Sequence, residues 1–73
     1  MGSGQILHWT LCHANRRLTC VESPAASGSE YAVLYDGLPV ATRVSSADQD
    51  GAAWAEEIRS AWESAGWMSI PSR

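Results

Sequence analysis

The dipeptide Asp36-Gly37 constrains the fold more than any other feature, because it lies between two segments of strand-forming residues, 31–35 and 38–44. Asp and Gly both tolerate positive φ angles, which a two-residue type I′ turn requires at its two central positions. The sequence therefore predicts a β-hairpin that turns at this dipeptide.

The position of the turn sets the register of this hairpin. Tyr35 should face Leu38, and Val33 should face Val40. One face of the hairpin then carries Tyr31, Val33, Tyr35, Leu38, Val40 and Val44. The opposite face carries Ala32, Leu34, Pro39, Ala41 and Arg43.

A second pair of extended segments precedes this hairpin. Residues 5–13 alternate, which is typical of a half-buried strand, with Leu7, Trp9, Leu11 and His13 on one face and His8, Thr10 and Cys12 on the other. Residues 14–17 provide a turn, and residues 18–22 form the strand that pairs with the first. Residues 23–29 are rich in Ser, Pro and Gly and are predicted to form a loop.

A helix is predicted over residues 47–65, after Ser45-Ser46, which offers an N-cap. The small and apolar residues that recur at three- and four-residue intervals are Gly51, Trp54, Ala55, Ile58, Ala61, Trp62 and Ala65. Gly66 suits the left-handed position that follows a helix, with Trp67 packing back on Trp62 in a Schellman motif.

These elements predict an α+β fold in which an antiparallel β-sheet of about four strands, formed by two hairpins, is covered on one face by a single C-terminal α-helix (ββββα). Seventy-three residues are enough for one domain with a small core. We expect residues 1–4 to be a flexible N-terminus or a remnant of an expression vector, residues 5–67 to form the domain, and residues 68–73 to be a tail.

The charge is acidic, with five Arg, no Lys and eight Asp or Glu, for a formal net charge of −3. This balance disfavours nucleic acid as a partner, because phosphate backbones are bound by clustered cations. No apolar run approaches the roughly 20 residues that cross a bilayer, and the N-terminus lacks a signal-peptide pattern, so we expect a cytoplasmic protein without membrane contact. Abundant Ala, Gly and Arg without Lys suggest a GC-rich bacterial or phage genome.

Cys12 and Cys20 are candidates for a disulfide. A hairpin that turns about Arg16 would place them directly opposite each other, and closing so short a loop would stabilise the fold by about 2.5 kcal/mol. A change of one residue in the register separates them, and two reduced cysteines are the alternative that a cytoplasmic location favours.

Four nitrogen or sulfur ligands, His8, Cys12, His13 and Cys20, lie within a short stretch, but their spacing argues against a metal site. His8 and Cys12 are roughly 13 Å apart along a strand, and the neighbours Cys12 and His13 point to opposite faces, which also separates a thiolate from its base. No GxSxG, P-loop or GxGxxG motif is present. We therefore predict no catalytic residue, metal, cofactor or small-molecule site, and a protein that is not an enzyme.

The segment from Tyr31 to Trp62 contains a strand, Asp36-Gly37, a second strand, Ser45-Ser46 and then Ala-Trp-Ala-Glu-Glu at residues 53–57. In this order it resembles the sheet-plus-helix arm-binding domains of phage-type integrases. The resemblance covers less than half of the chain and implies the same fold over that part. In that family the sheet enters the DNA major groove through basic side chains, whereas this sequence offers Arg43 and no Lys.

One helix can cover only one face of a sheet, yet both faces of the second hairpin carry apolar residues. The leading hypothesis is a small non-enzymatic interaction module whose uncovered face contacts a second copy or another protein. Its candidate partner-binding residues are Ala32, Leu34, Ala41 and Arg43, with Trp9 as an aromatic anchor.

Two alternatives remain open. The first is an acidic phage or mobile-element inhibitor that docks on a nucleic-acid-binding complex through the acidic surface residues Asp48, Asp50, Glu56, Glu57 and Glu63. The second is a sheet domain that binds DNA weakly through Arg16, Arg17 and Arg43.

Overall fold

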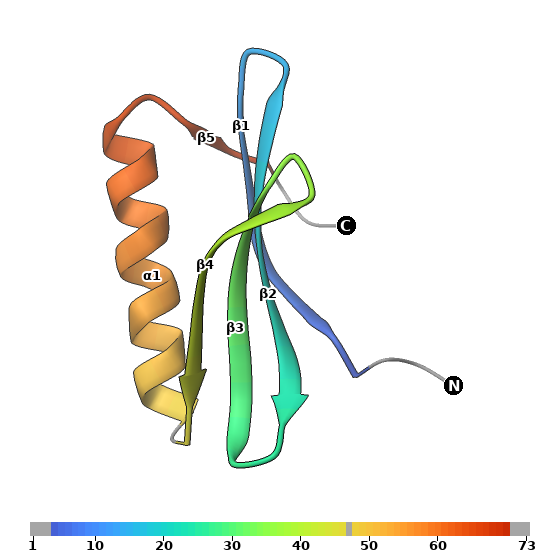
Figure 1. The fold of residues 1–73 in the computed structure, drawn as a ribbon. Coiled ribbons are helices and arrows are strands. Elements are labelled where there is room, and N and C mark those ends of the chain that lie inside the picture. Colours follow the sequence, from blue (N-terminus) through green and yellow to red (C-terminus); the bar gives the residue numbers. More distant parts are fainter. Residues whose placement is uncertain (1–3, 47, 71–73) are drawn as a thin grey trace.

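The computed structural model describes residues 4–46 and 48–70 and consists of one sheet and one helix (Figure 1). The elements in chain order are β1 (Ile6–His13), β2 (Arg16–Ala25), β3 (Gly28–Tyr35), β4 (Leu38–Ser45), α1 (Asp48–Ser64) and β5 (Met68–Ser69). The antiparallel α+β fold predicted from the sequence, ββββα, is thus confirmed, with a short fifth strand added at the end.

The five strands lie in the order β4-β3-β2-β1-β5, and every neighbouring pair is antiparallel. The first four strands form a continuous meander instead of two separate hairpins. Residues 23–29, predicted to be a loop, instead complete β2 and β3 on either side of a turn at Ala26-Ser27. Residues 68–69, predicted to belong to the tail, instead pair with β1 at Leu11 and Cys12.

The turn at Asp36-Gly37 has the predicted conformation, with φ angles of 51° and 88°. The first hairpin differs from the prediction, because it turns at Ala14-Asn15 and pairs His13 with Arg16. Ala14 adopts a φ of 55°, a left-handed value that non-glycine residues adopt rarely and that no Gly or Asp in the sequence signalled.

A β-bulge in β1 overturns the predicted alternation of that strand. Leu7 pairs with Val21 and Trp9 pairs with Cys20, so His8 is the additional residue between them. The bulge leaves Trp9 on the face that α1 covers and turns Leu7 to the opposite face.

A second bulge, in β4, overturns the predicted register of the second hairpin. Leu34 pairs with Pro39 and Val33 pairs with Ala41, so Val40 is the additional residue. Ala41 consequently packs against the core, and Arg43, opposite Tyr31, lies on the same face of the sheet. The sequence analysis placed Ala41 and Arg43 on the face that no helix covers, and this prediction is wrong.

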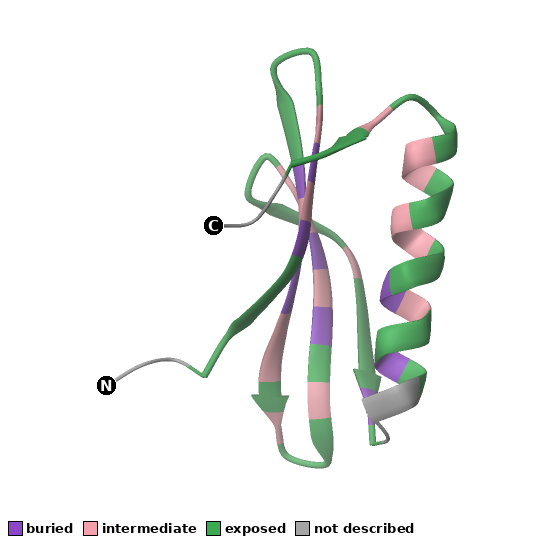
Figure 2. Cartoon of the chain, turned by 180° about the vertical axis from the view of Figure 1, so that it is seen from behind, coloured by how far each residue is buried: buried purple, intermediate pink, exposed green. Residues whose placement is uncertain are grey.

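The hydrophobic core lies between α1 and the centre of the sheet, where the buried residues gather in Figure 2. Its buried members are Trp9, Leu11, Leu18, Cys20, Tyr31, Val33 and Ala55. Trp54, Ile58 and Trp62 of the predicted helix stripe pack against this cluster, whereas Ala61 and Ala65 are exposed. The C-terminal part of α1 therefore presents a narrower apolar face than predicted.

The helix ends in the predicted Schellman motif. Gly66 has a φ of 108°, and its N–H donates to the carbonyl oxygen of Glu63 at 3.0 Å, while the N–H of Trp67 donates to that of Trp62 at 3.2 Å. The rings of Trp62 and Trp67 meet edge to face with their centroids 5.3 Å apart. This ending turns the chain back toward β1, where β5 begins (Figure 1).

Two contacts fix α1 on the sheet. The Trp9 Nε1–H donates to the backbone carbonyl oxygen of Ala55 at 3.2 Å, and Trp9 is only 8% exposed. A Cβ placed on Gly51 would overlap Cε1 of the buried Tyr31 ring, so only glycine allows this approach. Trp9 is therefore a core residue, and the prediction that it anchors a partner is wrong.

Replacing Gly51 with Ala should destabilise the fold even though Ala favours helices by about 1 kcal/mol over Gly. The added methyl group must displace Tyr31 or the helix, and overpacking of this kind costs about 1–3 kcal/mol. Urea unfolding of Gly51→Ala and of Ser60→Ala, an exposed position on the same helix, would measure the effect. A Gly51→Ala variant more stable than the parent would contradict the close approach.

Candidate interaction surface

The face of the sheet opposite α1 is the candidate functional surface, and we call it the helix-free face. The paired positions of the strands place sixteen residues on it, namely Leu7, Thr10, Cys12, Arg17, Thr19, Val21, Ser23, Ala25, Gly28, Glu30, Ala32, Leu34, Pro39, Thr42, Val44 and Met68. Among the described residues no helix or loop packs over this face, and Figure 1 shows α1 on the other side of the sheet.

The helix-free face is largely apolar. Leu7, Val44 and Met68 are 51%, 55% and 70% exposed, and Ala32 and Leu34 are half-buried near its centre. Isolated apolar side chains are normal on protein surfaces, but a contiguous group of them marks a contact site. Since β2 and β3 carry the centre of this group, the contact surface follows the middle of the sheet.

Among the residues that the structure describes, this face carries two charged side chains, Arg17 and Glu30. Arg17 lies beside the turn between β1 and β2, and Glu30, which pairs with Ser23, lies near the other end of β2 and β3. Among the described residues neither side chain makes a hydrogen bond or an ion pair, and both residues are exposed. The two charges therefore flank the apolar centre with opposite signs.

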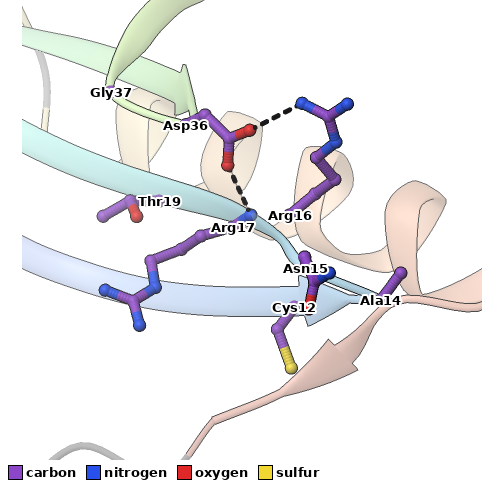
Figure 3. A pocket seen from close by; sticks show the side chains of 8 residues that line it. All are labelled: Cys12, Ala14, Asn15, Arg16, Arg17, Thr19, Asp36 and Gly37. Atoms are coloured by element: carbon purple, nitrogen blue, oxygen red, sulfur yellow. Dashed lines mark hydrogen bonds and ion pairs between the residues drawn. The ribbon is translucent and has the colours of Figure 1, made fainter.

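An open hollow of about 600 Å³ lies at the Arg17 end of the face, where two turns meet (Figure 3). It is lined by Cys12, Ala14, Asn15, Arg16, Arg17, Thr19, Asp36 and Gly37. The Arg17 guanidinium and the Cys12 sulfur point to one side of the sheet, and Arg16 points to the other (Figure 3).

Asp36 holds the two turns together. Its Oδ1 accepts a hydrogen bond from the backbone N–H of Arg17 at 2.9 Å, and its Oδ2 accepts one from Arg16 Nη1 at 3.0 Å. The backbone N–H of Asp36 in turn donates to the carbonyl oxygen of Arg17 at 2.8 Å. The hydrogen bond from Arg17 and the nearby Arg16 guanidinium lower the pKa of this carboxyl group.

The two cysteines lie on opposite faces and are free, so the candidate disulfide is not formed and the structure has the reduced alternative. The turn at Ala14-Asn15 pairs Cys12 with Arg17, and Cys20 pairs with Trp9 inside the core. Burial raises the pKa of the Cys20 thiol to about 11, which keeps it protonated and unreactive at neutral pH.

The two histidines also lie apart. His8 Nε2 is 2.8 Å from Glu22 Oε1, and its ring stacks on Tyr31, while the ring of His13 lies beside Trp67 with centroids 5.6 Å apart. Hydrogen bonds from Ser29 and His8 lower the pKa of Glu22. Within residues 4–46 and 48–70, no three His, Cys, Asp or Glu side chains gather as a metal ion would require.

The predicted acidic surface divides into two groups on α1. Glu56 and Glu63 both form ion pairs with Arg59, at 2.6 and 3.0 Å, and the pairing with Arg59 lowers the pKa of Glu56. Asp50 and Glu57 line an open hollow of about 250 Å³ between β4 and α1, together with Arg43, Ala53 and Trp54. The side chain of Asp48 lies outside the described residues.

Of the five residues predicted to bind a partner, Ala32 and Leu34 lie on the helix-free face, while Trp9, Ala41 and Arg43 lie on the face that α1 covers. The sequence analysis missed Leu7, which the bulge at His8 exposes there. It also missed Glu30, because reading residues 23–29 as a loop hid its pairing with Ser23.

Comparison with protein-family models, with curated proteins and with solved structures found no match to this chain. Among the described residues, no helix combines the length and the apolarity that crossing a bilayer requires.

The pH dependence of stability should reveal the role of Asp36. Because its pKa is lowered in the folded protein, its contribution is present above its ordinary pKa of 3.8 and is lost as the pH falls through the folded-state value. Asp36→Asn keeps a residue suited to the turn and removes the charge. Urea titrations should show this variant less stable than the parent near neutral pH, with the gap closing in acid. A gap that stays constant down to acid pH would contradict this role.

Alkylation should distinguish the two thiols. Iodoacetamide at about pH 8 should modify Cys12 while Cys20, with its raised pKa and full burial, reacts only when the protein unfolds. Mass spectrometry of peptides from a time course measures both rates, and a sample in guanidinium provides the control in which both cysteines react. Equal rates in the folded protein would show that Cys20 is not shielded.

Proposed function

We propose that this protein is a small non-enzymatic interaction module and that the helix-free face is its contact surface. The observation that carries the proposal is that one helix covers one face of the sheet, while the other face exposes Leu7, Val44 and Met68 around half-buried Leu34. An exposed group of apolar side chains gains free energy when a partner removes it from water, at about 25 cal/mol per Å².

The composition of the face favours a protein partner over a polyanion. Its two charges have opposite signs, so the face is close to neutral, whereas phosphate backbones are bound by clustered Arg and Lys. The two unpaired cysteines are consistent with a reducing compartment, and the cytoplasm of a bacterial or phage-infected cell is the proposed location.

The acidic inhibitor remains a second candidate, with less support. Arg59 already forms ion pairs with Glu56 and Glu63, and Asp50 and Glu57 share their hollow with Arg43. Carboxylates that have a cation beside them contribute less to a docking surface that mimics nucleic acid.

DNA binding has less support as well, because its three candidate arginines do not share a surface. Arg16 is bound to Asp36, Arg17 lies on the helix-free face, and Arg43 lies on the covered face. The resemblance to integrase arm-binding domains concerns residues 31–62 and stays a prediction.

Two leucine variants test the proposed surface. Leu7 and Leu38 are 51% and 70% exposed, but Leu7 lies on the helix-free face and Leu38, opposite Tyr35, does not. Leu7→Glu should weaken self-association of the protein, or its binding to a partner, by about tenfold or more, because the variant places a charge inside an apolar contact. Leu38→Glu should leave this association unchanged.

The measurements are sedimentation of the purified protein and quantitative affinity capture from extracts of the source cell. Circular dichroism of both variants establishes that they remain folded. Association that Leu7→Glu and Leu38→Glu change equally, or that neither changes, would refute the proposed surface.

A further inference from the structure

We propose that the occupant of the helix-free face is a second copy of this chain, packed face to face about a two-fold axis that crosses the strands. The inference rests on the proposed function and names the partner. It follows from the positions of the two charges on the face and from the sizes of the side chains between them.

The charges are placed symmetrically about the centre of the face. Glu30 pairs with Ser23, which lies six residues beyond Arg17 on β2, so the two charges are roughly 20 Å apart along the strands. The midpoint lies between the rows of Thr19 and Val21. A two-fold axis that crosses the strands at this level makes the strands of the second copy run opposite to those of the first. Arg17 of each copy then lies over the end of the sheet that carries Glu30 in the other copy.

The reach of the arginine suits this pairing. Sheets that pack face to face lie about 10 Å apart, and the long Arg17 side chain lies on the side of the sheet that would face this space (Figure 3). Glu30 is on the strand next to Arg17, so the two charges are offset sideways by one strand spacing of about 4.8 Å, which the length of the arginine side chain can span. The axis repeats the contact, and the dimer contains two Arg17–Glu30 pairs.

The same axis matches large side chains with small ones. Leu34 and Ala32 are two residues apart on β3 and lie on either side of the axis, so each Leu34 lies over Ala32 of the other copy. On β2 the axis lays the apolar Val21 over Thr19, a β-branched side chain of similar size. Alternation of large and small side chains across facing layers is how two sheets interdigitate.

Two other arrangements fit less well. A two-fold axis parallel to the strands would bring Arg17 toward Arg17 and Glu30 toward Glu30, and like charges in an interface cost free energy. Edge-to-edge pairing through β4 is hindered by Pro39, which lacks an N–H, and by the bulge at Val40.

Charge reversal tests the dimer. Sedimentation equilibrium from about 1 to 500 µM should show the parent chain associating. Arg17→Glu and Glu30→Arg should each weaken the dimer by about tenfold or more, and the double variant should recover to within about threefold of the parent. Arg43→Glu, an exposed arginine on the covered face, is the matched control and should leave the dimer unchanged.

Three outcomes would overturn the inference: a parent chain that stays monomeric throughout this range, single reversals that leave the dimer unchanged, or a double variant that stays weak. Two of these results would still support the proposed function: a monomer that binds another protein through Leu7, and a dimer that is disrupted by Leu7→Glu but not by charge reversal. If the circular dichroism spectrum shows that a charge-reversal variant is unfolded, Arg17→Gln and Glu30→Gln replace it in the test. Each of these variants should weaken the dimer by about threefold.

Discussion

The contact between the first half of α1 and the centre of the sheet determines the rest of the structure. Gly51 lies against the ring of Tyr31, and Trp9 reaches across to the backbone of Ala55. These contacts fix which face of the sheet is covered. Because α1 spans 17 residues, about 25 Å, and is the one helix among the described residues, the opposite face has no layer over it.

Two β-bulges then decide which side chains each face receives. Without the additional residue at His8, Leu7 would lie on the same face as Trp9, and without the one at Val40, Arg43 would lie on the helix-free face. The first bulge adds an apolar side chain to the open face, and the second removes a charge from it. Both changes make that face more apolar and more neutral, which suits contact with protein better than contact with nucleic acid.

The sequence was sufficient for every element whose conformation depends on near neighbours. The Asp36-Gly37 turn, the helix and its ending at Gly66 and Trp67 all follow from local preferences and are confirmed. The bulge at His8 and the turn at Ala14-Asn15 depend on how whole strands fit together, and no Gly or Pro lies at either. Pro39, directly before Val40, is the one local sign of the bulge in β4. A bulge shifts the face of every residue beyond it, so the missed bulge at Val40 put two of the five predicted contact residues, Ala41 and Arg43, on the wrong face.

The uncovered face also bears on stability, because a chain of 73 residues has little surface to bury. Its core holds Leu11, Leu18 and Val33, but Leu7, Val44 and Met68 remain outside. A second copy packed on the helix-free face would supply the missing layer and bury these side chains without lengthening the chain. Folding and association would then be linked, since a partner that binds only the folded state stabilises it in proportion to the logarithm of its concentration. The exposed face that limits the free energy of unfolding of the monomer would thus stabilise the dimer.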